Sequence, residues 1–317
     1  MFSYLRKAGI LGINRRVGEF ILPYNPRKHF PKVDDKILTY IMAKQYKIAQ
    51  PDIYFTVSTA GQLKTIQRRL EKLESFVIKP SRGAMGNGIL LINSVTKNEG
   101  ADSDHELVFD TSRGDMNLKD VKYHISDILS GMYSLSGQPD QVIIQEKLSI
   151  HPTLGEYAYK GIPDIRVIVF KGYPVMAMIR LPTKSSRGRA NLHQGAVGCG
   201  INLKTGQITG AVCQDKWITN HPDTGHILED LVIPFWDEVL ELSSRCYEIT
   251  SMGYIGVDLV LDENAGPLLL EINARPGLSI QIANKAGLKP RLDYIKLLSE
   301  EIPIPEKIKL IKQGVLF

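Results

Sequence analysis

The spacing of apolar and polar residues predicts a mixture of helices and antiparallel strands. Apolar residues recur at helical intervals in residues 34–48, 60–73, 117–130 and 231–251, with Asp34 or Asp35 as the cap of the first helix. Short apolar runs predict strands at 76–79, 89–92, 141–145, 165–170, 174–180, 255–261 and 267–272. Residues 95–115 are polar and are expected to form a loop. This mixed order favours α+β lobes over a doubly wound sheet.

A glycine-bearing loop, residues 81–88, separates the first two predicted strands. Strand, glycine loop and strand form a hairpin pattern, whereas a P-loop or Rossmann site leads from a strand into a helix. Lys79 lies directly before the loop and could neutralise phosphate oxygens, while backbone N–H groups from Gly83 onwards close over them. The alternative is a plain hairpin with a surface lysine.

The strongest set of chemical groups comprises Asp258, Glu271 and Asn273. Glu271 and Asn273 are two apart on one predicted strand, so their side chains leave the same face. The hairpin can bring Asp258, on the neighbouring strand, beside them. Carboxylate and amide oxygens are ligands that Mg²⁺ prefers. The alternative is a solvent-facing edge hairpin, but the apolar flanks indicate burial, and a buried carboxylate pair needs a counter-charge.

Three arginines, Arg166, Arg180 and Arg189, have the planar donor geometry that suits phosphate or carboxylate groups, although each alone is more typical of a surface residue. His193 is a candidate general base, with a hydrogen-bonded loop histidine as the alternative. Residues 146–148 follow a buried strand and could offer backbone hydrogen bonds to an adenine edge. The sequence contains no G-x-S-x-G nucleophile elbow.

Composition is typical of a soluble globular protein: 317 residues, 43% hydrophobic, 23% charged and a net charge of +5. A basic cleft for phosphates or scattered surface lysines and arginines would both produce this mild excess, and we expect no nucleic-acid partner. Three cysteines without a CxxC pair are typical of the reducing cytoplasm. No run of 18 apolar residues is present, so no membrane span is predicted.

The chain divides into three predicted parts. Residues 1–33 form a basic arm that is rich in turn formers. The arm also carries many aromatic and aliphatic residues, so we expect it to pack against the core. Residues 34–302 form the main domain, with a smaller lobe at 53–148 and a larger, metal-binding lobe at 149–302. Residues 303–317 form a tail.

Seven motifs follow one another along the chain: FVIKP (76–80), the glycine loop, VIIQE (142–146), DIR (164–166), RANLHQG (189–195), GVD (256–258) and EINARPG (271–277). Their order resembles that of the ATP-grasp superfamily, and residues 34–290 most resemble its RimK-type α-L-glutamate ligase-like branch. The resemblance implies an α+β, ATP-grasp fold in which two lobes hold ATP between them. Such ligases usually carry a substrate domain before this core, and here only 33 residues precede Asp34.

The resemblance also implies site residues. The implied nucleotide contacts are Lys36, Lys79, Gly83, Gly86, Glu146, Lys147, Leu148, Asp164, Arg189 and Asn191. Asp258, Glu271 and Asn273 would hold one or two Mg²⁺ ions, for which Mn²⁺ can substitute. Arg166 and Arg189 would be the catalytic residues, with Arg166 holding an acyl phosphate.

The implied reaction is ATP-dependent ligation of a carboxylate to an amine through an acyl phosphate, with glutamate or another amino acid or peptide as substrate. This reaction needs charge neutralisation more than a protein nucleophile. Two alternatives remain: a nucleotide-binding regulatory or scaffold subunit, and a small-molecule or sugar kinase that stops at phosphoryl transfer. A second copy of the chain or a partner protein would complete the substrate site.

Overall fold

The computed structural model describes residues 7–83, 86–98, 106–134 and 137–314, which form two compact units. The smaller unit comprises Asp35–Ile37 and Pro51–Leu148, and the larger unit comprises the rest of the chain. Each unit has its own sheet and its own apolar core. Among the described residues, no helix is long and apolar enough to cross a membrane.

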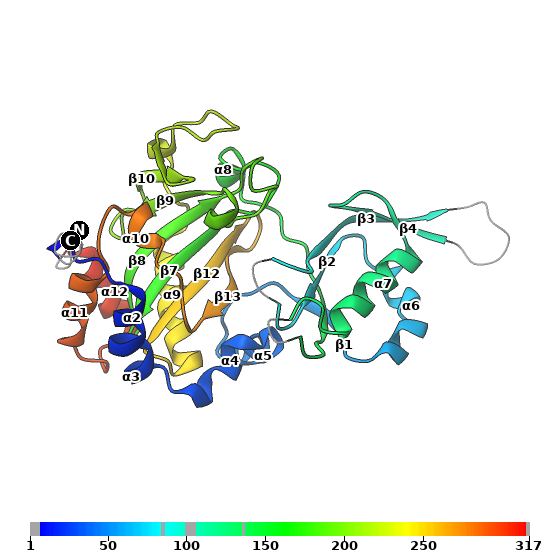
Figure 1. The fold of residues 1–317 in the computed structure, drawn as a ribbon, viewed down its shortest axis with the longest axis horizontal. Helices are drawn as coiled ribbons and strands as arrows, with labels where there is room; N and C mark the ends of the chain where they lie inside the picture. Colours follow the sequence, from blue (N-terminus) through cyan, green and yellow to red (C-terminus); the bar gives the residue numbers. More distant parts are fainter. Residues whose placement is uncertain (1–6, 84–85, 99–105, 135–136, 315–317) are drawn as a thin grey trace. The chain divides into compact units, whose positions relative to one another are not determined.

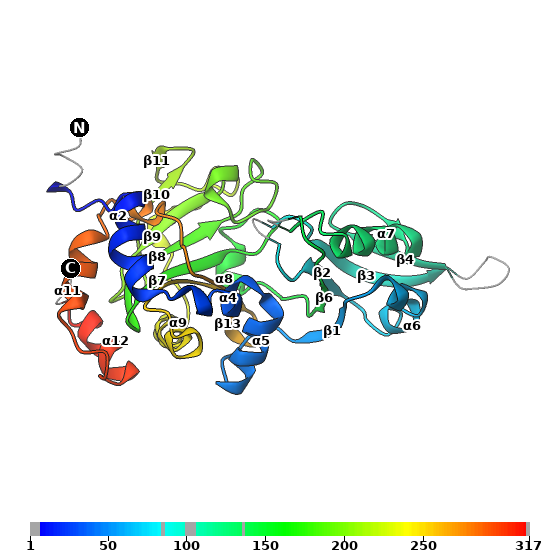
Figure 2. The ribbon, with the colours of Figure 1, turned by 60° about the horizontal axis from the view of Figure 1, so that its bottom comes forward.

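The smaller unit is a six-stranded antiparallel sheet with helix α7 (Leu118–Leu129) packed across it (Figures 1 and 2). From edge to edge its strands are β1 (Ile53–Val57), β6 (Val142–Gln145), β2 (Phe76–Pro80), β3 (Leu90–Asn98), β4 (Glu106–Thr111) and β5 (Met116–Asn117). The predicted hairpin at the glycine loop is confirmed, since β2 and β3 pair antiparallel. Asn117 caps α7 by accepting a hydrogen bond from the Asp120 N–H.

Two predictions for the smaller unit are wrong. The helix expected at 60–73 is instead a 3₁₀ turn, η3 (Ala60–Lys64), and one short helix, α6 (Gln67–Leu70). The loop expected at 95–115 contains the end of β3 and all of β4, which pair with each other. Leu107 and Phe109 are buried while Asp110 is exposed, so β4 alternates as a half-buried strand does. The polar residues of β4 made the apolar alternation too weak to predict a strand from the sequence.

The larger unit is built on a seven-stranded antiparallel sheet. Its strands, in order, are β11 (Lys216–Ile218), β10 (Ile208–Cys213), β9 (Val197–Ile201), β8 (Tyr173–Leu181), β7 (Asp164–Phe170), β12 (Tyr254–Asp262) and β13 (Gly266–Asn273). Every residue of β12 is buried, which explains why its sequence is a nearly continuous apolar run. The predicted hairpins β7–β8 and β12–β13 are confirmed.

Helices pack around this sheet at several points (Figure 1). Helix α9 (Trp236–Thr250) contacts β7, β8, β12 and β13, and it begins five residues later than the sequence pattern predicts. The delay follows from Phe235, whose left-handed backbone (φ 53°) ends the preceding extended segment. Apart from the N-terminal arm, the other helical segments are α5 (Lys36–Gln45), whose first two residues belong to the smaller unit, α8 (Pro152–Gly155), α10 (Ile280–Ala283), α11 (Lys289–Lys296), α12 (Ile304–Lys312) and the 3₁₀ turns η4 (Leu192–Gln194) and η5 (Leu228–Asp230).

The N-terminal arm packs on the larger unit, as expected from its apolar residues. Its described part forms α2 (Ile13–Arg16), η1 (Val17–Ile21), α3 (Leu22–Tyr24), η2 (Arg27–His29) and α4 (Pro31–Asp34). Leu11, Phe20, Ile21 and Val33 are buried in the core of that unit. Residues 1–6 of the predicted arm, including Arg6, lie outside the described residues.

Candidate active site

Strand pairing in the larger unit brings four charged side chains together. Asp258 on β12 lies opposite Arg166 on β7, and Asp164 on β7 lies opposite Arg180 on β8. On its other side, Asp258 lies opposite Glu271 of β13. Side chains of directly opposed residues leave the same face of a sheet. Four consecutive strands, from β8 through β7 and β12 to the edge strand β13, therefore present charged groups on one face.

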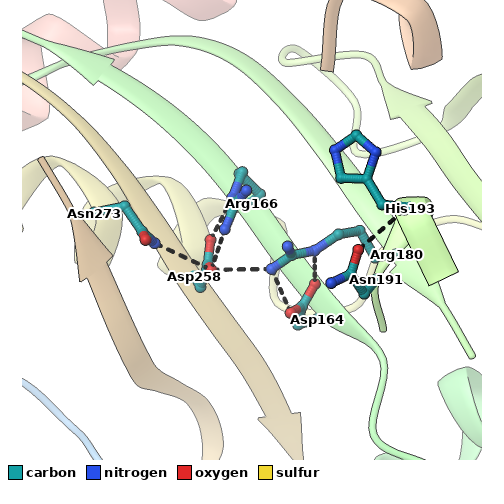
Figure 3. A network of polar contacts seen from close by, with 7 residues as sticks. All are labelled: Asp164, Arg166, Arg180, Asn191, His193, Asp258 and Asn273. Atoms are coloured by element: carbon teal, nitrogen blue, oxygen red, sulfur yellow. Dashed lines mark hydrogen bonds and ion pairs between the residues drawn. The ribbon is translucent and has the colours of Figure 1, made fainter. Parts of the chain in front are cut away.

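Asp258 is the centre of this network (Figure 3). Its Oδ1 accepts from Arg166 Nε at 2.7 Å, and its Oδ2 accepts from a terminal nitrogen of Arg166 at 2.5 Å and of Arg180 at 2.9 Å. Asn273 Nδ2 donates to the same Oδ2 at 3.2 Å. Asp164 accepts two further hydrogen bonds from Arg180. Arg180 thus bridges the two aspartates.

The two aspartates have opposite pKa shifts. Burial acts to raise the pKa of Asp258, but Arg166 and Arg180 outweigh it and lower the pKa to about 2. Burial raises the pKa of Asp164 to about 6, because Arg180 offsets only part of the desolvation and the negative Asp258 adds to it. Asp258 therefore stays ionised across the neutral range, and Asp164 takes up a proton in mildly acidic solution.

Glu271 and Asn273 complete the predicted metal set on β13. Both lie on the strand that pairs with β12, opposite Asp258 and Gly256 respectively. Among the described residues, no group of three or more His, Cys, Asp or Glu side chains gathers to hold a metal. The predicted set instead combines two carboxylates with one amide oxygen. That donor set fits Mg²⁺, which is bound in proteins through one or two carboxylates together with substrate phosphates and water.

The RANLHQG motif lies on a structured loop before β9. Asn191 Oδ1 accepts from the His193 N–H at 3.0 Å and so caps the 3₁₀ turn η4. Arg189 reaches Gln194 Oε1 at 3.3 Å. The side chain of His193 is exposed, and its ring does not point toward Asp258 (Figure 3). The structure thus leaves the loop-histidine interpretation of His193 in place.

In the smaller unit, the glycine loop is tied down at both ends. Lys36 Nζ donates to Gly83 O at 2.7 Å, and the Arg82 N–H donates to Asp140 at 2.9 Å. At the far end, His124 Nε2 donates to Gly88 O at 2.9 Å. Lys79 is buried at the end of β2, directly before the loop. Residues 84–85 of the predicted loop lie outside the described residues.

The glycines of this loop have distinct structural roles. A Cβ on Gly83 would come within 2.3 Å of Pro80 Cγ, so this position has no room for a side chain. Gly86 has φ 74° and no neighbour within 4 Å of a Cβ, so its requirement is conformational. Loops of this kind leave backbone N–H groups available to oxygen anions.

The proposed adenine segment, residues 146–148, follows β6 in the smaller unit. The Glu146 N–H donates to Asp52 O at 2.9 Å, and the Glu146 side chain accepts from the Asp52 N–H at 3.1 Å. Lys147 Nζ donates to Asn93 Oδ1 at 2.9 Å. The two bonds between Glu146 and Asp52 hold the segment beside the start of β1.

Sequence reasoning missed the central place of Arg180. The sequence marked Arg180 only as one of three arginines suited to anions, whereas the structure places it between Asp164 and Asp258. A regular β7–β8 hairpin can be paired residue by residue from its turn, starting with Phe170 opposite Tyr173. Regular pairing of this kind would place Ile179, and not Arg180, opposite Asp164. A β-bulge between Ile168 and Val169 shifts the register by one residue.

Comparison with known proteins gives one family match. The model of the sugar-transfer associated ATP-grasp family matches residues 15–297. The matched range includes Asp258, the three charged residues bonded around it (Asp164, Arg166 and Arg180) and most of the arm. A comparison with curated proteins finds no match.

Three similar solved structures are each distant in sequence. D-alanyl-alanine synthetase A from Vibrio cholerae is 8% identical with a TM-score of 0.47, covering 91% of this chain and 66% of that chain. The ATP-grasp ligase PsnB with a phosphomimetic variant of its minimal precursor, Mg and ADP is 14% identical with a TM-score of 0.45, covering 86% and 61%. D-alanine–D-alanine ligase from Bacillus anthracis with ATP is 13% identical with a TM-score of 0.42, covering 90% and 68%. This chain thus spans about three fifths of the PsnB chain.

Proposed function

The chain belongs to the sugar-transfer associated ATP-grasp family, and from that premise we propose that it is an ATP- and Mg²⁺-dependent ligase that joins a carboxylate to an amine. Its fold is the ATP-grasp fold, with mixed α and β content and two sheets. We further propose that the chain belongs to the α-L-glutamate ligase-like branch. In that case it would add glutamate or another amino acid to an amine acceptor. We also propose a cytoplasmic location, which agrees with three free cysteines among the described residues.

One observation carries the proposal: a buried, ionised Asp258 that faces Glu271 and Asn273 and lies between two arginines. Asp258, Glu271 and Asn273 would hold Mg²⁺, which would neutralise the phosphate charge that develops during transfer. Arg166 and Arg180 keep Asp258 ionised, and so keep it a competent ligand. Arg166 makes two hydrogen bonds to Asp258, and it is the candidate to hold the acyl phosphate once those bonds are exchanged.

The smaller unit supplies groups suited to a nucleotide. Lys79 and the backbone of the loop from Gly83 to Gly86 would contact phosphate oxygens. The Glu146 N–H is already bonded to Asp52, so an adenine edge would use the Glu146 carbonyl and the Leu148 N–H. Lys36 donates to the Gly83 carbonyl, and by holding the loop there it would position the loop for the phosphates.

The larger unit supplies the remaining nucleotide contacts in the proposal. Arg189 and Asn191 would contact phosphates from the structured loop before β9. Asp164 would lie on the ribose side of the nucleotide. Its raised pKa allows it to act as a hydrogen-bond donor in mildly acidic solution and as an acceptor above about pH 6.

The proposed reaction has two steps. A substrate carboxylate oxygen attacks the γ-phosphorus of ATP, the bond to the β-phosphate oxygen breaks, and ADP leaves. An amine nitrogen then attacks the acyl carbon, the bond to the phosphate oxygen breaks, and the nitrogen loses a proton. Charge neutralisation by arginine and lysine carries this chemistry, and no protein nucleophile is required.

The test is product analysis with purified protein, Mg-ATP and a panel of carboxylates and amines. The panel should contain amino acids and peptides, and also amino sugars and uronic acids, because the family description associates it with sugar transfer. Ligation predicts ADP, phosphate and a new amide detected by mass spectrometry. A phosphorylated sugar without an amide would identify a kinase instead. Nucleotide binding without any turnover on the panel would favour the regulatory or scaffold alternative.

A partner requirement can be tested in the same preparation. The proposal allows a second copy of the chain, or another protein, to complete the acceptor side of the site. Light scattering after size exclusion, with and without Mg-ATP, measures the mass of the assembly. A monomer that ligates on its own would contradict the need for a partner.

A further inference from the structure

The N-terminal arm touches the larger unit where β12 begins and where β13 ends. Phe20 packs edge-on against Phe170 with ring centroids 5.6 Å apart, and Tyr24 packs against the same ring at 4.8 Å. The Gly253 N–H donates to Tyr24 O at 2.8 Å, directly before β12. These contacts anchor the arm, and they place its polar residues beside the hairpin that carries Asp258 and Asn273.

Asn25 closes the open end of that hairpin. The last paired residues of the β12–β13 ladder are Gly256 and Asn273. Beyond them, Asn25 Nδ2 donates to Tyr254 O at 2.6 Å and to Ala274 O at 2.9 Å, and Asn25 Oδ1 accepts from the Tyr254 N–H at 2.9 Å. Asn25 is only 2% exposed, so water does not reach this position. Without the Asn25 side chain, the two carbonyls would therefore lose a hydrogen-bond donor that water does not replace.

A second arm residue binds the loop that follows β13, residues 274–277. A terminal nitrogen of Arg16 donates to Pro276 O at 2.6 Å. On its other side the loop lies close to β12, because a Cβ on Gly256 would be 2.5 Å from Pro276 Cβ. A Cβ on Gly277 would be 4.0 Å from a terminal nitrogen of Arg166. The loop is thus held between the arm and the charged network.

We propose that Asn25 and Arg16 are positioning residues for the metal site. They hold the loop at 274–277, and through it they set the direction of Asn273, which precedes the loop, and the space around Arg166. Residues that support metal ligands from behind affect metal affinity by about tenfold to a hundredfold when they are removed. This inference rests on the proposed function of Asp258, Glu271 and Asn273 as metal ligands.

The test uses Asn25→Ala and Arg16→Met, with Asn284→Ala as the matched control. Asn284 also donates through Nδ2 to two carbonyls, those of Ala177 and Ile280, both at 2.9 Å, but it touches neither the loop at 274–277 nor the charged network. Electron paramagnetic resonance of Mn²⁺ with saturating ADP measures metal binding directly. Thermal unfolding shows whether each variant remains folded at the temperature of the measurement.

The expected result is a rise of about tenfold in the Mn²⁺ dissociation constant for Asn25→Ala and for Arg16→Met, with ADP affinity in the absence of metal unchanged. Asn284→Ala should leave both constants unchanged. Folded Asn25→Ala and Arg16→Met proteins that bind Mn²⁺ like the unsubstituted protein would overturn the positioning role. If Asn25→Ala does not fold, Arg16→Met alone decides. Failure of the unsubstituted protein to bind Mn²⁺ with ADP would instead refute the proposed metal site.

Discussion

Asp258 and Glu271 lie opposite each other on β12 and β13, and the proposed metal site depends on both. Asp258→Asn should abolish Mg²⁺-dependent ATP turnover, because an amide in place of the carboxylate removes the charge that attracts the ion. Glu271→Ala should have the same effect. ADP release in excess Mg²⁺ measures the loss.

Asp262→Ala is the control for both substitutions. Asp262 is a buried aspartate at the far end of β12, where it accepts from the Ser149, Asn264 and Ala265 N–H groups. The Asp262→Ala substitution should lower the free energy of unfolding and leave metal-dependent ATP turnover unchanged. Normal ADP release by folded Asp258→Asn and Glu271→Ala would show that the metal assignment is wrong.

Lys79 is the residue of the smaller unit that is proposed to contact the ATP phosphates. Lys79→Met keeps most of the buried aliphatic chain and removes one charged contact to phosphate, which should cost about 1.5–3 kcal/mol of binding free energy, or about tenfold to a hundredfold in affinity. Calorimetric titration with a non-hydrolysable ATP analogue measures it. Lys97→Met, on the exposed face of β3, should bind normally. Equal affinity for both variants would return Lys79 to the plain-hairpin interpretation.

Asp164 predicts a specific dependence of stability on pH. Its pKa is about 6 in the folded protein against an ordinary value of 3.8, so the folded state binds the proton more tightly than the unfolded state does. The free energy of unfolding should therefore fall as pH rises from about 4 to 6 through this group. Asp164→Asn should remove that fall, as measured by urea unfolding at several pH values. Parallel profiles for the two proteins would contradict the shift.

The glycine loop is the element with the clearest expected response to ligand. Gly86 and Gly88 have positive φ, which lets the backbone turn N–H groups toward an anion. Hydrogen exchange at Gly83 and at residues 86–88 should slow when Mg-ATP is added, because bound phosphates would occupy those N–H groups, whereas the N–H groups of Ser81 and Arg82 are already bonded within the protein. Exchange in α7 serves as the internal control. Equal exchange in the loop with and without Mg-ATP would count against phosphate binding there.

The hairpins show how far single elements could be predicted. β2–β3, β7–β8 and β12–β13 are all apparent from short apolar runs separated by turn residues, because each is a local structure with a buried face. β4 and the pair β9–β10 were missed. Their strands are short or carry glycine and polar residues, and only pairing with a neighbour identifies them.

For the whole molecule, the arm is part of the core of the larger unit. Deleting residues 2–30 would uncover Phe170 and Tyr254 and remove the Asn25 bridge. The truncated protein should therefore unfold at a lower temperature or fail to fold, in contrast to an arm that serves only recognition. Thermal unfolding compared with the full chain measures this. A truncated protein of unchanged stability would contradict the structural role.

Residue types and their spacing along the chain are sufficient to propose the chemistry of the candidate site. Residue type and spacing were enough to select Asp258, Glu271 and Asn273, because period-two spacing on a strand is a local property of the chain. The apolar content of the arm was likewise enough to predict that it packs, since burial of such residues is favourable wherever a surface is available. The charge pattern around Arg166 and Arg180 could not be read in the same way.

Which charged residues lie opposite each other depends on strand register, and the sequence pattern alone gives a different register. Counting outward from the turn at 262–266 would place Leu270 opposite Asp258, and a β-bulge between Asp258 and Leu259 brings Glu271 there instead. A second bulge, after Ile168, aligns Arg180 with Asp164. A bulge inserts one residue in response to packing across the whole sheet, and a one-residue slip sends every following side chain to the other face. The ion network around Asp258 is therefore a property of the assembled sheet.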